Sequence, residues 1–385
     1  MKYYTFGKPT GRYIGSSGDL QVYSDSIYRG QAFTISSAAR RFPEDISFRY
    51  GPSTGGMIEA MGVDFLTPGE LIKDVHLEPE HKLRHLQILG RPVEDAILVV
   101  ERINAFHAAA NSIAFASAVE DAVGIEITKG VMLSRILGLE LERIRSHLYV
   151  IERLCQAAGF GVPAHQLSYL RERMSRVISA ACGHRYFFNS VRYGNSHIEK
   201  DKVVPEVRGV AAEFERIYRD LMESRLFINR LINNGRISYD KLVGPAARAS
   251  GHAYDARADS QVLDYSGMSF TPVVRSNADA LARMQVRAEE ILQSADIIEE
   301  AAKRAVVAHP ETECRGSGEG AARVESPQGD LFYFVKVEDS KISGIAMVSP
   351  SKSNMWAFSE SMKGNVFTDF HFNWESFGIW ICEAG

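Results

Sequence analysis

The segment from Glu101 to Ser112, ERINAFHAAANS, places a side-chain amide and an imidazole within one predicted helix. Asn104 and His107 lie three residues apart, the spacing at which two side chains share one helical face. Such a pair can bind a metal ion or a small polar ligand, and an imidazole can also carry a proton. The two side chains can equally fill interior space, and the residue types alone leave both interpretations open.

A second group of polar residues lies in the segment LERIRSHL, which contains Glu142, Arg143 and His147. These residues can shape a cavity, but their spacing is also that of ordinary hydrogen bonds along a helix, and we favour the structural role. The chain has four cysteines and no CxxC motif, which argues against a disulfide framework and against a self-contained zinc or iron–sulfur site.

Several helices must position these residues. Helical periodicity predicts four long segments, 91 to 122, 128 to 158, 165 to 187 and 205 to 234, and a fifth at 277 to 308. Alternating patterns and turn glycines predict small β layers before residue 90 and a hairpin or meander after Pro310. We therefore predict an α+β fold in which a long-helix bundle is flanked by small β layers at both ends of the chain.

This pattern divides the chain into three predicted regions. Residues 1 to 90 form a β and loop region with a glycine-rich turn, and residues 91 to 309 form the helical bundle with a structured loop at 244 to 260. Residues 310 to 385 form a β meander and a terminal segment that packs on the cavity.

Composition excludes several classes of protein. The net charge of -4 and the isoelectric point near 6.3 provide no basic surface for nucleic acid. The start of the sequence lacks an apolar core of signal-peptide length, and no apolar stretch is long enough to span a bilayer. We expect a globular, cytosolic chain.

A series of motifs resembles the large subunit of nickel–iron hydrogenases of the membrane-bound type related to complex I. ERINAFHAAANS lies where that family has ERICGICSxxH, LELERIRSHL resembles LAELERIxxHL, and GHRYFFNSVRYG resembles TGxRxxxNxxRxGG. GPAARASGHAYDARAD is similar to GPxxRASGxxYDxR, and GEGAARVESPQGDLFYFV is similar to GEGxxxVEAPRGExxHYV. The motifs occur in the same order from about Gly51 to the C-terminus, and together they imply the fold of this family.

The resemblance also identifies the positions at which relatives hold nickel and iron through four cysteine thiolates. In this chain these positions carry Asn104, His107, Trp380 and Glu383, and Cys382 is only adjacent to one of them. The resemblance therefore implies that this chain has no nickel–iron centre and no hydrogenase activity, because bridged nickel and iron require soft sulfur ligands. A rebuilt metal site on one histidine, one carboxylate and one amide would have a poor set of ligands.

Complex I uses the same cavity to reduce a quinone between a histidine in a PSTHG turn and a tyrosine. The resemblance places Gly55 at the histidine and Ala105 at the tyrosine, so both hydrogen-bonding groups are missing here. His81, in EPEHKLRHLQ, lies where relatives have an HRGxE turn and is either a titrating group near the cavity mouth or a solvated histidine. Arg257 matches a position that lies near the iron–sulfur cluster of the partner in relatives, with a structural salt bridge as the alternative.

The resemblance implies a subunit of a hetero-oligomeric, membrane-anchored redox complex that couples electron transfer to ion translocation. Its implied partners are a small subunit that carries a 4Fe-4S cluster and membrane subunits related to complex I and to antiporters. Two alternatives remain at this point. The chain is a reductase subunit for a quinone or another small acceptor, with His107, Glu383 and His81 as candidate proton donors, or it is a structural adaptor without a substrate.

Overall fold

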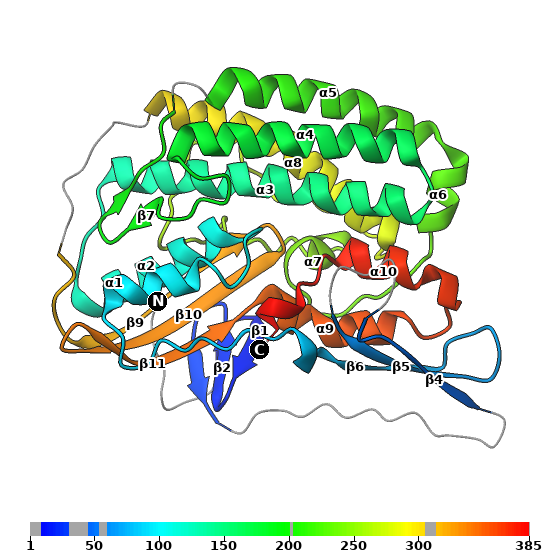
Figure 1. Ribbon diagram of the computed structural model, residues 1–385, viewed down its shortest axis with the longest axis horizontal. Coiled ribbons are helices and arrows are strands. Elements are labelled where there is room, and N and C mark those ends of the chain that lie inside the picture. Colours follow the sequence, from blue (N-terminus) through cyan, green and yellow to red (C-terminus); the bar gives the residue numbers. More distant parts are fainter. Residues whose placement is uncertain (1–8, 31–44, 54–59, 201–202, 305–312, 385) are drawn as a thin grey trace.

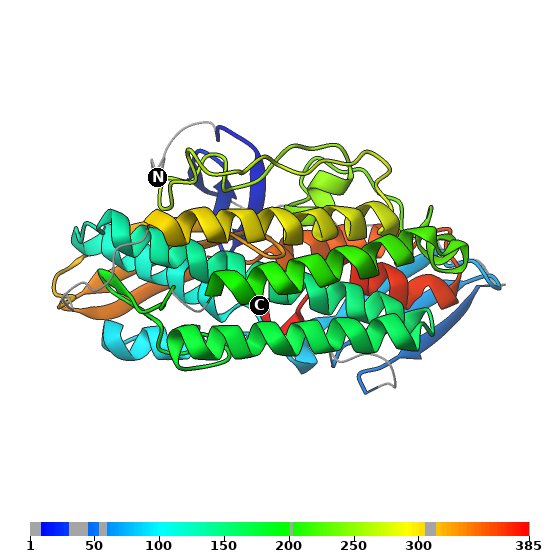
Figure 2. The same cartoon turned by 90° about the horizontal axis from the view of Figure 1, so that it is seen from above.

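The computed structural model describes residues 9–30, 45–53, 60–200, 203–304 and 313–384. Long helices form one layer of the molecule, and small antiparallel sheets with the shorter helices form the layer beneath it (Figure 1). The view in Figure 2 shows the long helices α3, α4, α5 and α8 running along the long axis of the molecule. The predicted α+β fold with a dominant helical bundle is confirmed.

The helices of the bundle and of the shorter segments have these bounds: α1 Val93–Val100, α2 Ala108–Val123, α3 Lys129–Ala157, α4 Gly161–Cys182, α5 Val203–Glu223, α6 Arg225–Leu231, α7 Gly244–Ala249, α8 Ala280–Arg304, α9 Pro350–Ser361 and α10 Phe370–Phe377, with 3-10 turns η1 Pro79–His81, η2 Phe367–Asp369 and η3 Ile381–Glu383. The strands are β1 Tyr13–Ser17, β2 Leu20–Tyr23, β3 Ile27–Arg29, β4 Ile46–Tyr50, β5 Gly62–Thr67, β6 Asp74–Glu78, β7 Val191–Arg192, β8 Asn195–Ser196, β9 Gly318–Ser326, β10 Gly329–Glu338 and β11 Lys341–Val348.

Helix α3 is the central element of the bundle and agrees with the prediction for 128 to 158. Thr128 caps its N-terminus by accepting a hydrogen bond from the Val131 N–H at 3.4 Å. Its apolar side chains are buried between α4 and α8, and several charged side chains on the same helix are also buried. Because charged groups are rarely buried without partners, the polar positions of α3 are where a functional site should be sought.

Two predicted helices are interrupted, and side-chain hydrogen bonds explain both breaks. The segment 91 to 122 divides into α1 and α2, because the Asn104 Oδ1 accepts from the Phe106 N–H at 3.0 Å and so competes with helical hydrogen bonding. Arg145 further fixes the turn by donating to the Ala105 carbonyl at 2.9 Å. The segment 205 to 234 divides at Ser224, which caps α6 through the Phe227 N–H at 3.4 Å.

The small sheets are antiparallel and three-stranded, with the orders β1-β2-β3, β4-β5-β6 and β11-β10-β9, and β7 pairs with β8. The predicted meander near the C-terminus is the last of the three-stranded sheets, and its strands β9 and β10 pack against α2. Loop 244 to 260 begins with the short helix α7, which contacts β10, and η3 follows α10 and contacts α9. Segments that are far apart in the sequence therefore meet around α2 and α3.

No helix in the described parts of the chain combines the length and the apolar character that a membrane crossing requires.

Candidate functional site

The break between α1 and α2 places His107 against the C-terminal turn η3. The His107 Nδ1 lies 3.0 and 3.1 Å from the two carboxylate oxygens of Glu383, and both side chains are buried. The Asn104 Nδ2 lies 3.2 Å from the same nitrogen, and the two residues are part of a turn and not of a helix.

Further buried polar groups surround this pair. Asn111 donates to the Glu383 Oε1 at 3.1 Å and accepts from the Tyr333 hydroxyl at 2.7 Å. The Ser146 hydroxyl lies 3.4 Å from the His107 Nε2 and accepts from the Gln328 Nε2 at 3.1 Å. We refer to the complete set as the His107 cluster: Asn104, His107, Asn111, Ser146, Gln328, Tyr333 and Glu383.

Aromatic rings close the space next to the His107 cluster. The Trp380 ring stacks on Phe106 with centroids 4.8 Å apart and on Tyr149 with centroids 5.5 Å apart. The same indole contacts His107 edge to face at 5.8 Å. A pocket of about 20 Å³ beside Trp380 is lined by residues of α3 and of the segment 374–380, and none of its described lining residues belongs to the His107 cluster. The ring contacts therefore place Trp380 between His107 and Tyr149.

Glu142 adds a titratable group at the start of α2. Its carboxylate accepts from the Ala109 N–H at 2.8 Å and from the Ala110 N–H at 2.9 Å, so it satisfies two of the free N–H groups at that helix end. Burial raises the pKa of Glu142 to about 7, although His107, Arg145 and the two N–H groups favour its charged form. A carboxyl group with a pKa near 7 can exchange a proton at physiological pH.

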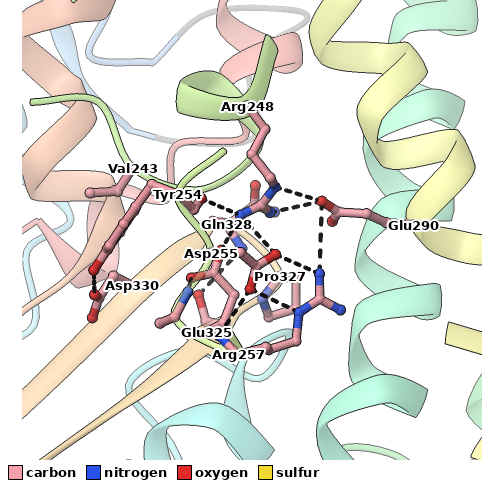
Figure 3. Close-up of polar contacts among 12 residues, drawn as sticks. Val243, Arg248, Tyr254, Asp255, Arg257, Glu290, Glu325, Pro327, Gln328 and Asp330 are labelled. Atoms are coloured by element: carbon pink, nitrogen blue, oxygen red, sulfur yellow. Dashed lines mark hydrogen bonds and ion pairs between the residues drawn. The ribbon is translucent and has the colours of Figure 1, made fainter. Parts of the chain in front are cut away.

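A second buried cluster joins loop 244 to 260 to α3 and α8. Arg248 donates to Glu290 at 2.8 Å and to Glu325 at 2.7 Å, and it lies 3.0 Å from Asp255 (Figure 3). Arg257 donates to Asp255 at 2.7 Å and also lies 3.3 Å from Glu140. We call this second cluster the arginine–carboxylate network. It consists of Glu140, Arg143, His147, Arg248, Asp255, Arg257, Glu290 and Glu325.

Burial and neighbouring charges set the pKa values of the groups in this network. Burial alone would raise the pKa of Asp255, but Arg248 and Arg257 lower it to about 2, so Asp255 remains ionised. Burial lowers the pKa of His147 to about 3, against the hydrogen bond that it makes with Glu290 at 2.8 Å. Burial, assisted by Asp255, raises the pKa of Glu325 to about 7. Except for Glu325, these groups keep one charge state throughout the physiological range.

The two clusters lie on different faces of α3. Glu142 and Ser146 are four residues apart and point to α2 and His107, whereas Glu140, Arg143 and His147 contact loop 244 to 260, β9 and α8. A spacing of three or four residues keeps side chains on one face of a helix, so the sequence of α3 assigns each residue to its cluster.

Comparisons with known proteins agree with this architecture. Residues 159–315 match the family model described as the 49 Kd subunit of respiratory-chain NADH dehydrogenase. The membrane-bound hydrogenase subunit alpha of Pyrococcus furiosus is 25% identical over 84% of this chain and 83% of its own length. An NADH-quinone oxidoreductase subunit of Sorangium cellulosum is 28% identical over 74% of this chain and 79% of its own length.

A chain in the solved structure of an archaeal membrane-bound sulfane sulfur reductase has the same fold, with a TM-score of 0.79 and 21% identity, over 90% of this chain and 100% of that chain. The chain belongs to the superfamily of complex I and membrane-bound hydrogenase large subunits. The candidate residues from the sequence are therefore considered at the positions that the family resemblance gives them.

The four positions that the sequence resemblance pairs with nickel–iron ligands carry no thiolate. They are Asn104, His107, Trp380 and Glu383, and His107 and Glu383 bond to each other. Within the described ranges, no group of three or more His, Cys, Asp or Glu side chains is arranged to hold a metal ion. These side chains do not fit a bridged nickel–iron centre, which requires soft sulfur ligands.

The remaining candidates have different surroundings. His81 is exposed at the end of η1, whereas His107 and Glu383 are buried, so the structure does not unite the three candidate proton donors. Ala105 is half-buried and its carbonyl accepts from Arg145, and Gly55 lies outside the described residues. Arg257 is buried with Asp255 and Glu140, which are contacts of the structural kind.

Sequence reasoning missed several members of the His107 cluster. Asn111 follows His107 by four residues, so the same helical spacing was a signal for it. Tyr333, Gln328 and Ser146 reach the cluster from β10, the β9–β10 turn and α3, and nothing in their local sequence indicates this position.

Proposed function

We propose that this chain is the large subunit of a membrane-associated redox complex related to complex I, that it takes part in electron transfer coupled to ion translocation, and that it holds no nickel–iron centre. The observation that carries the proposal is the buried pair of His107 and Glu383, in which two residues at former metal-ligand positions bond to each other. The Trp380 ring contacts His107 edge to face, so an imidazole–carboxylate pair and an indole stand where the sequence resemblance places the metal ligands of hydrogenases.

The membership of the superfamily supports the redox part of the proposal. Two relatives are a membrane-bound hydrogenase subunit and a subunit of NADH-quinone oxidoreductase. Without a metal centre of its own, this chain would depend on the redox group of a partner for electron transfer. We propose that this partner is an iron–sulfur small subunit with a 4Fe-4S cluster. Membrane-embedded subunits related to complex I and to antiporters would attach the assembly to the membrane and carry the ions.

The buried acid–base groups support a role in proton handling within that complex. Glu142 is buried at the start of α2, where it accepts from two backbone N–H groups, and burial raises its pKa to about 7. A reduction event in a neighbouring subunit changes the local charge, and a buried carboxyl group with such a pKa responds by taking up or releasing a proton. The chain would thereby couple electron arrival to a change of charge inside the protein.

Metal analysis of the purified complex tests the absence of the nickel–iron centre. We expect no nickel, and no zinc or iron beyond the content of the partner's clusters, in the wild-type complex and in the variants His107→Ala and Glu383→Ala. Nickel, or extra zinc or iron that disappears in both variants while the complex stays assembled, would show that the cavity was rebuilt as a metal site.

Membrane vesicles test the coupling. Dithionite-reduced methyl viologen serves as the electron donor, a soluble quinone as the acceptor, and a pH-sensitive dye and sodium-isotope uptake report ion movement. We expect that removal of the chain abolishes the ion gradient and that the wild-type chain restores it. A gradient of unchanged size without the chain contradicts the proposal.

The variants Glu383→Gln and His107→Gln distinguish our proposal from the two alternatives, a structural adaptor and a reductase site. Size-exclusion chromatography verifies that each variant still assembles into the complex. If the chain is only an adaptor, both variants retain electron flow and the gradient. If it is a reductase site, both lose quinone reduction. Our proposal expects electron flow to persist while the gradient falls.

A further inference from the structure

The first turn of helix α9 contacts the C-terminal segment that carries Trp380 and Glu383. Strand β11 ends at Val348, and Ser349 follows it as the N-cap residue of α9, with Pro350 as the first helical residue. A serine and a proline in this order are typical of a helix start, so the local sequence fixes where α9 begins. Figure 1 shows the C-terminal end of the chain beside α9, and the turn η3 contacts this helix.

The Ser349 hydroxyl joins the start of α9 to Glu383. It accepts a hydrogen bond from the Lys352 N–H at 3.1 Å and donates one to the Glu383 carbonyl. A hydroxyl group has one hydrogen to donate and two lone pairs that accept, so a single serine caps the helix and holds the turn at the same time. The Ser349 side chain is buried, which shields both hydrogen bonds from water.

Ser351 holds the other end of the same turn. Its buried hydroxyl accepts from the Trp380 N–H at 3.0 Å. Within the turn, the Glu383 N–H donates to the Trp380 carbonyl at 3.1 Å. The two serines therefore hold the backbone of η3 at Trp380 and at Glu383, whose side chains both contact His107.

The first turn of α9 is itself fixed to other parts of the molecule. Asn354 accepts from the Val243 N–H at 3.0 Å and donates to the Val243 carbonyl at 3.1 Å. The Ser353 hydroxyl donates to the Ile14 carbonyl of β1 at 2.7 Å. Residues that are themselves held in place give rigid support to a neighbouring site, so this turn is suited to set the position of η3.

His107 is supported from a different direction. Arg145 donates to the Ala105 carbonyl at 2.9 Å and so holds the turn that precedes α2. The distance of 3.0 Å between the His107 Nδ1 and the Glu383 Oε1 therefore depends on two elements that are supported separately. Because hydrogen bonds exist only over a narrow range of distance, a small displacement of η3 would break this contact.

We infer that Ser349 and Ser351 are positioning residues, which place the Glu383 carboxylate and the Trp380 ring against His107. The importance of this placement for ion translocation rests on the proposed function, whereas the placement itself is testable on the purified full-length chain.

The coupling between His107 and Glu383 tests the role of Ser349. Urea unfolding of the wild type, His107→Ala, Glu383→Ala and the double variant gives a coupling factor, the factor by which the double variant departs from the product of the two separate effects on the unfolding equilibrium constant. We expect this factor to fall by about threefold or more in a Ser349→Ala background, because η3 loses a hydroxyl donor. Ser224→Ala, which removes the N-cap of α6, is the control and should preserve the factor within about twofold.

Ser349→Gly separates the positioning role from the capping role. Glycine is nearly as good as serine at an N-cap, so this variant removes the hydroxyl with little loss of helix stability and serves also if Ser349→Ala does not fold. It should lower the coupling factor as much as Ser349→Ala. An unchanged coupling factor in folded Ser349→Gly, verified by circular dichroism, overturns the role of Ser349.

Fluorine NMR of the chain labelled with 5-fluorotryptophan tests the role of Ser351. Trp380→Phe assigns the Trp380 resonance, which Ser351→Ala should shift or broaden while the Trp374 resonance keeps its position. Ser359→Ala is the control, because its hydroxyl donates to the Trp356 carbonyl within α9 at 2.8 Å, and it should leave the Trp380 resonance unchanged. A Trp380 resonance that is also unchanged in folded Ser351→Ala overturns the role of Ser351.

Membrane vesicles separate the positioning role from the proposed function. With the same electron donor and acceptor, Ser349→Gly should lower the ion gradient at unchanged electron flow, in the same direction as Glu383→Gln but by a smaller amount. A wild-type complex that builds no gradient contradicts the proposed function, and the coupling factor and the fluorine spectrum then decide the positioning role. A normal gradient in Ser349→Gly, where Glu383→Gln lowers it, contradicts the role of Ser349 at the site.

Discussion

The His107 cluster and the arginine–carboxylate network are both buried against α3, but they use polar groups in different ways. The network pairs three arginines with four carboxylates at close range, so its charges stabilise one another. The His107 cluster has one imidazole–carboxylate pair, and amides and hydroxyls provide its other contacts. The first arrangement is a scaffold of ion pairs, whereas the second is a hydrogen-bonded group in which most side chains carry no charge.

The position of the two clusters gives this difference its meaning. The network holds loop 244 to 260 against α3 and α8 (Figure 3), while the His107 cluster contains three of the positions that the sequence resemblance pairs with metal ligands, Asn104, His107 and Glu383. A change of residue at these positions would act on one face of α3, whereas the ion pairs on the other face would keep the fold. A superfamily member can in this way change its chemistry without losing its architecture.

Removal of Arg248 should have the largest effect on stability. Arg248→Met leaves Asp255, Glu290 and Glu325 buried without their shared counter-charge, and we expect the free energy of unfolding to fall by about 3 to 5 kcal/mol. Urea denaturation followed by circular dichroism measures this change. Arg208→Met is the control, because its ion pairs with Asp296 and Glu299 are exposed and should contribute less than about 1 kcal/mol. Equal losses in both variants would contradict the role of the network.

The second prediction concerns the pH dependence contributed by Glu142. Its pKa is about 7 in the folded chain and 4.5 ordinarily, so the folded state binds the proton more tightly. The protonated Glu142 carboxyl stabilises the folded chain fully below pH 4.5, and this stabilisation is lost as the pH rises to about 7. We expect the free energy of unfolding to fall by about 3 kcal/mol over that range. Glu142→Gln, which has no titrating group, should remove this part of the slope.

Urea denaturation at several pH values between these limits measures the slope for the wild type, for Glu142→Gln and for the exposed control Glu126→Gln. Identical slopes for the wild type and Glu142→Gln would contradict the raised pKa of Glu142, whereas Glu126→Gln should follow the wild type.

Much of the fold was predictable from the sequence, because helical periodicity is a local property. The predicted helix 128 to 158 differs from α3 by one residue at each end, and the meander after Pro310 is present. The break at 101 to 107 was only partly predictable from local pattern: the hydrogen bond from the Phe106 N–H to Asn104 is local, whereas Arg145 reaches the Ala105 carbonyl from α3. Long-range contacts of this kind override local preference.

The candidate site was predictable only in part for the same reason. Asn104 and His107 have a spacing that indicates contact, and motif resemblance located Glu383. Tyr333 and Asn111 lie 222 residues apart in the sequence, and their hydrogen bond depends on how β10 packs on α2. A side chain on a strand gives no local sign of the polar group that it will meet across the interior.

The third prediction measures how strongly His107 and Glu383 interact. In a double-mutant cycle of His107→Ala and Glu383→Ala, we expect a coupling energy of about 1 to 3 kcal/mol, because either single variant removes the direct hydrogen bond of a buried partner. Thermal or urea unfolding of the four proteins gives this energy. A parallel cycle of His107→Ala with His165→Ala, an exposed histidine, should be additive within about 0.5 kcal/mol. Additivity in the first cycle would show that the pair is not coupled.

The smallest effect is expected at the edge of the His107 cluster, where the Tyr333 hydroxyl donates to the Asn111 Oδ1 at 2.7 Å. Tyr333→Phe keeps the ring but leaves that oxygen without its donor, and should lower the free energy of unfolding by about 1 kcal/mol. Tyr169→Phe, whose ring is 59% exposed, is the control and should have no measurable effect. The variant Tyr333→Phe also removes the partner that orients the Asn111 amide toward Glu383, so its effect should shrink in a Glu383→Ala background. An unchanged effect in that background would mean that Tyr333 stabilises the chain independently of the acid–base pair.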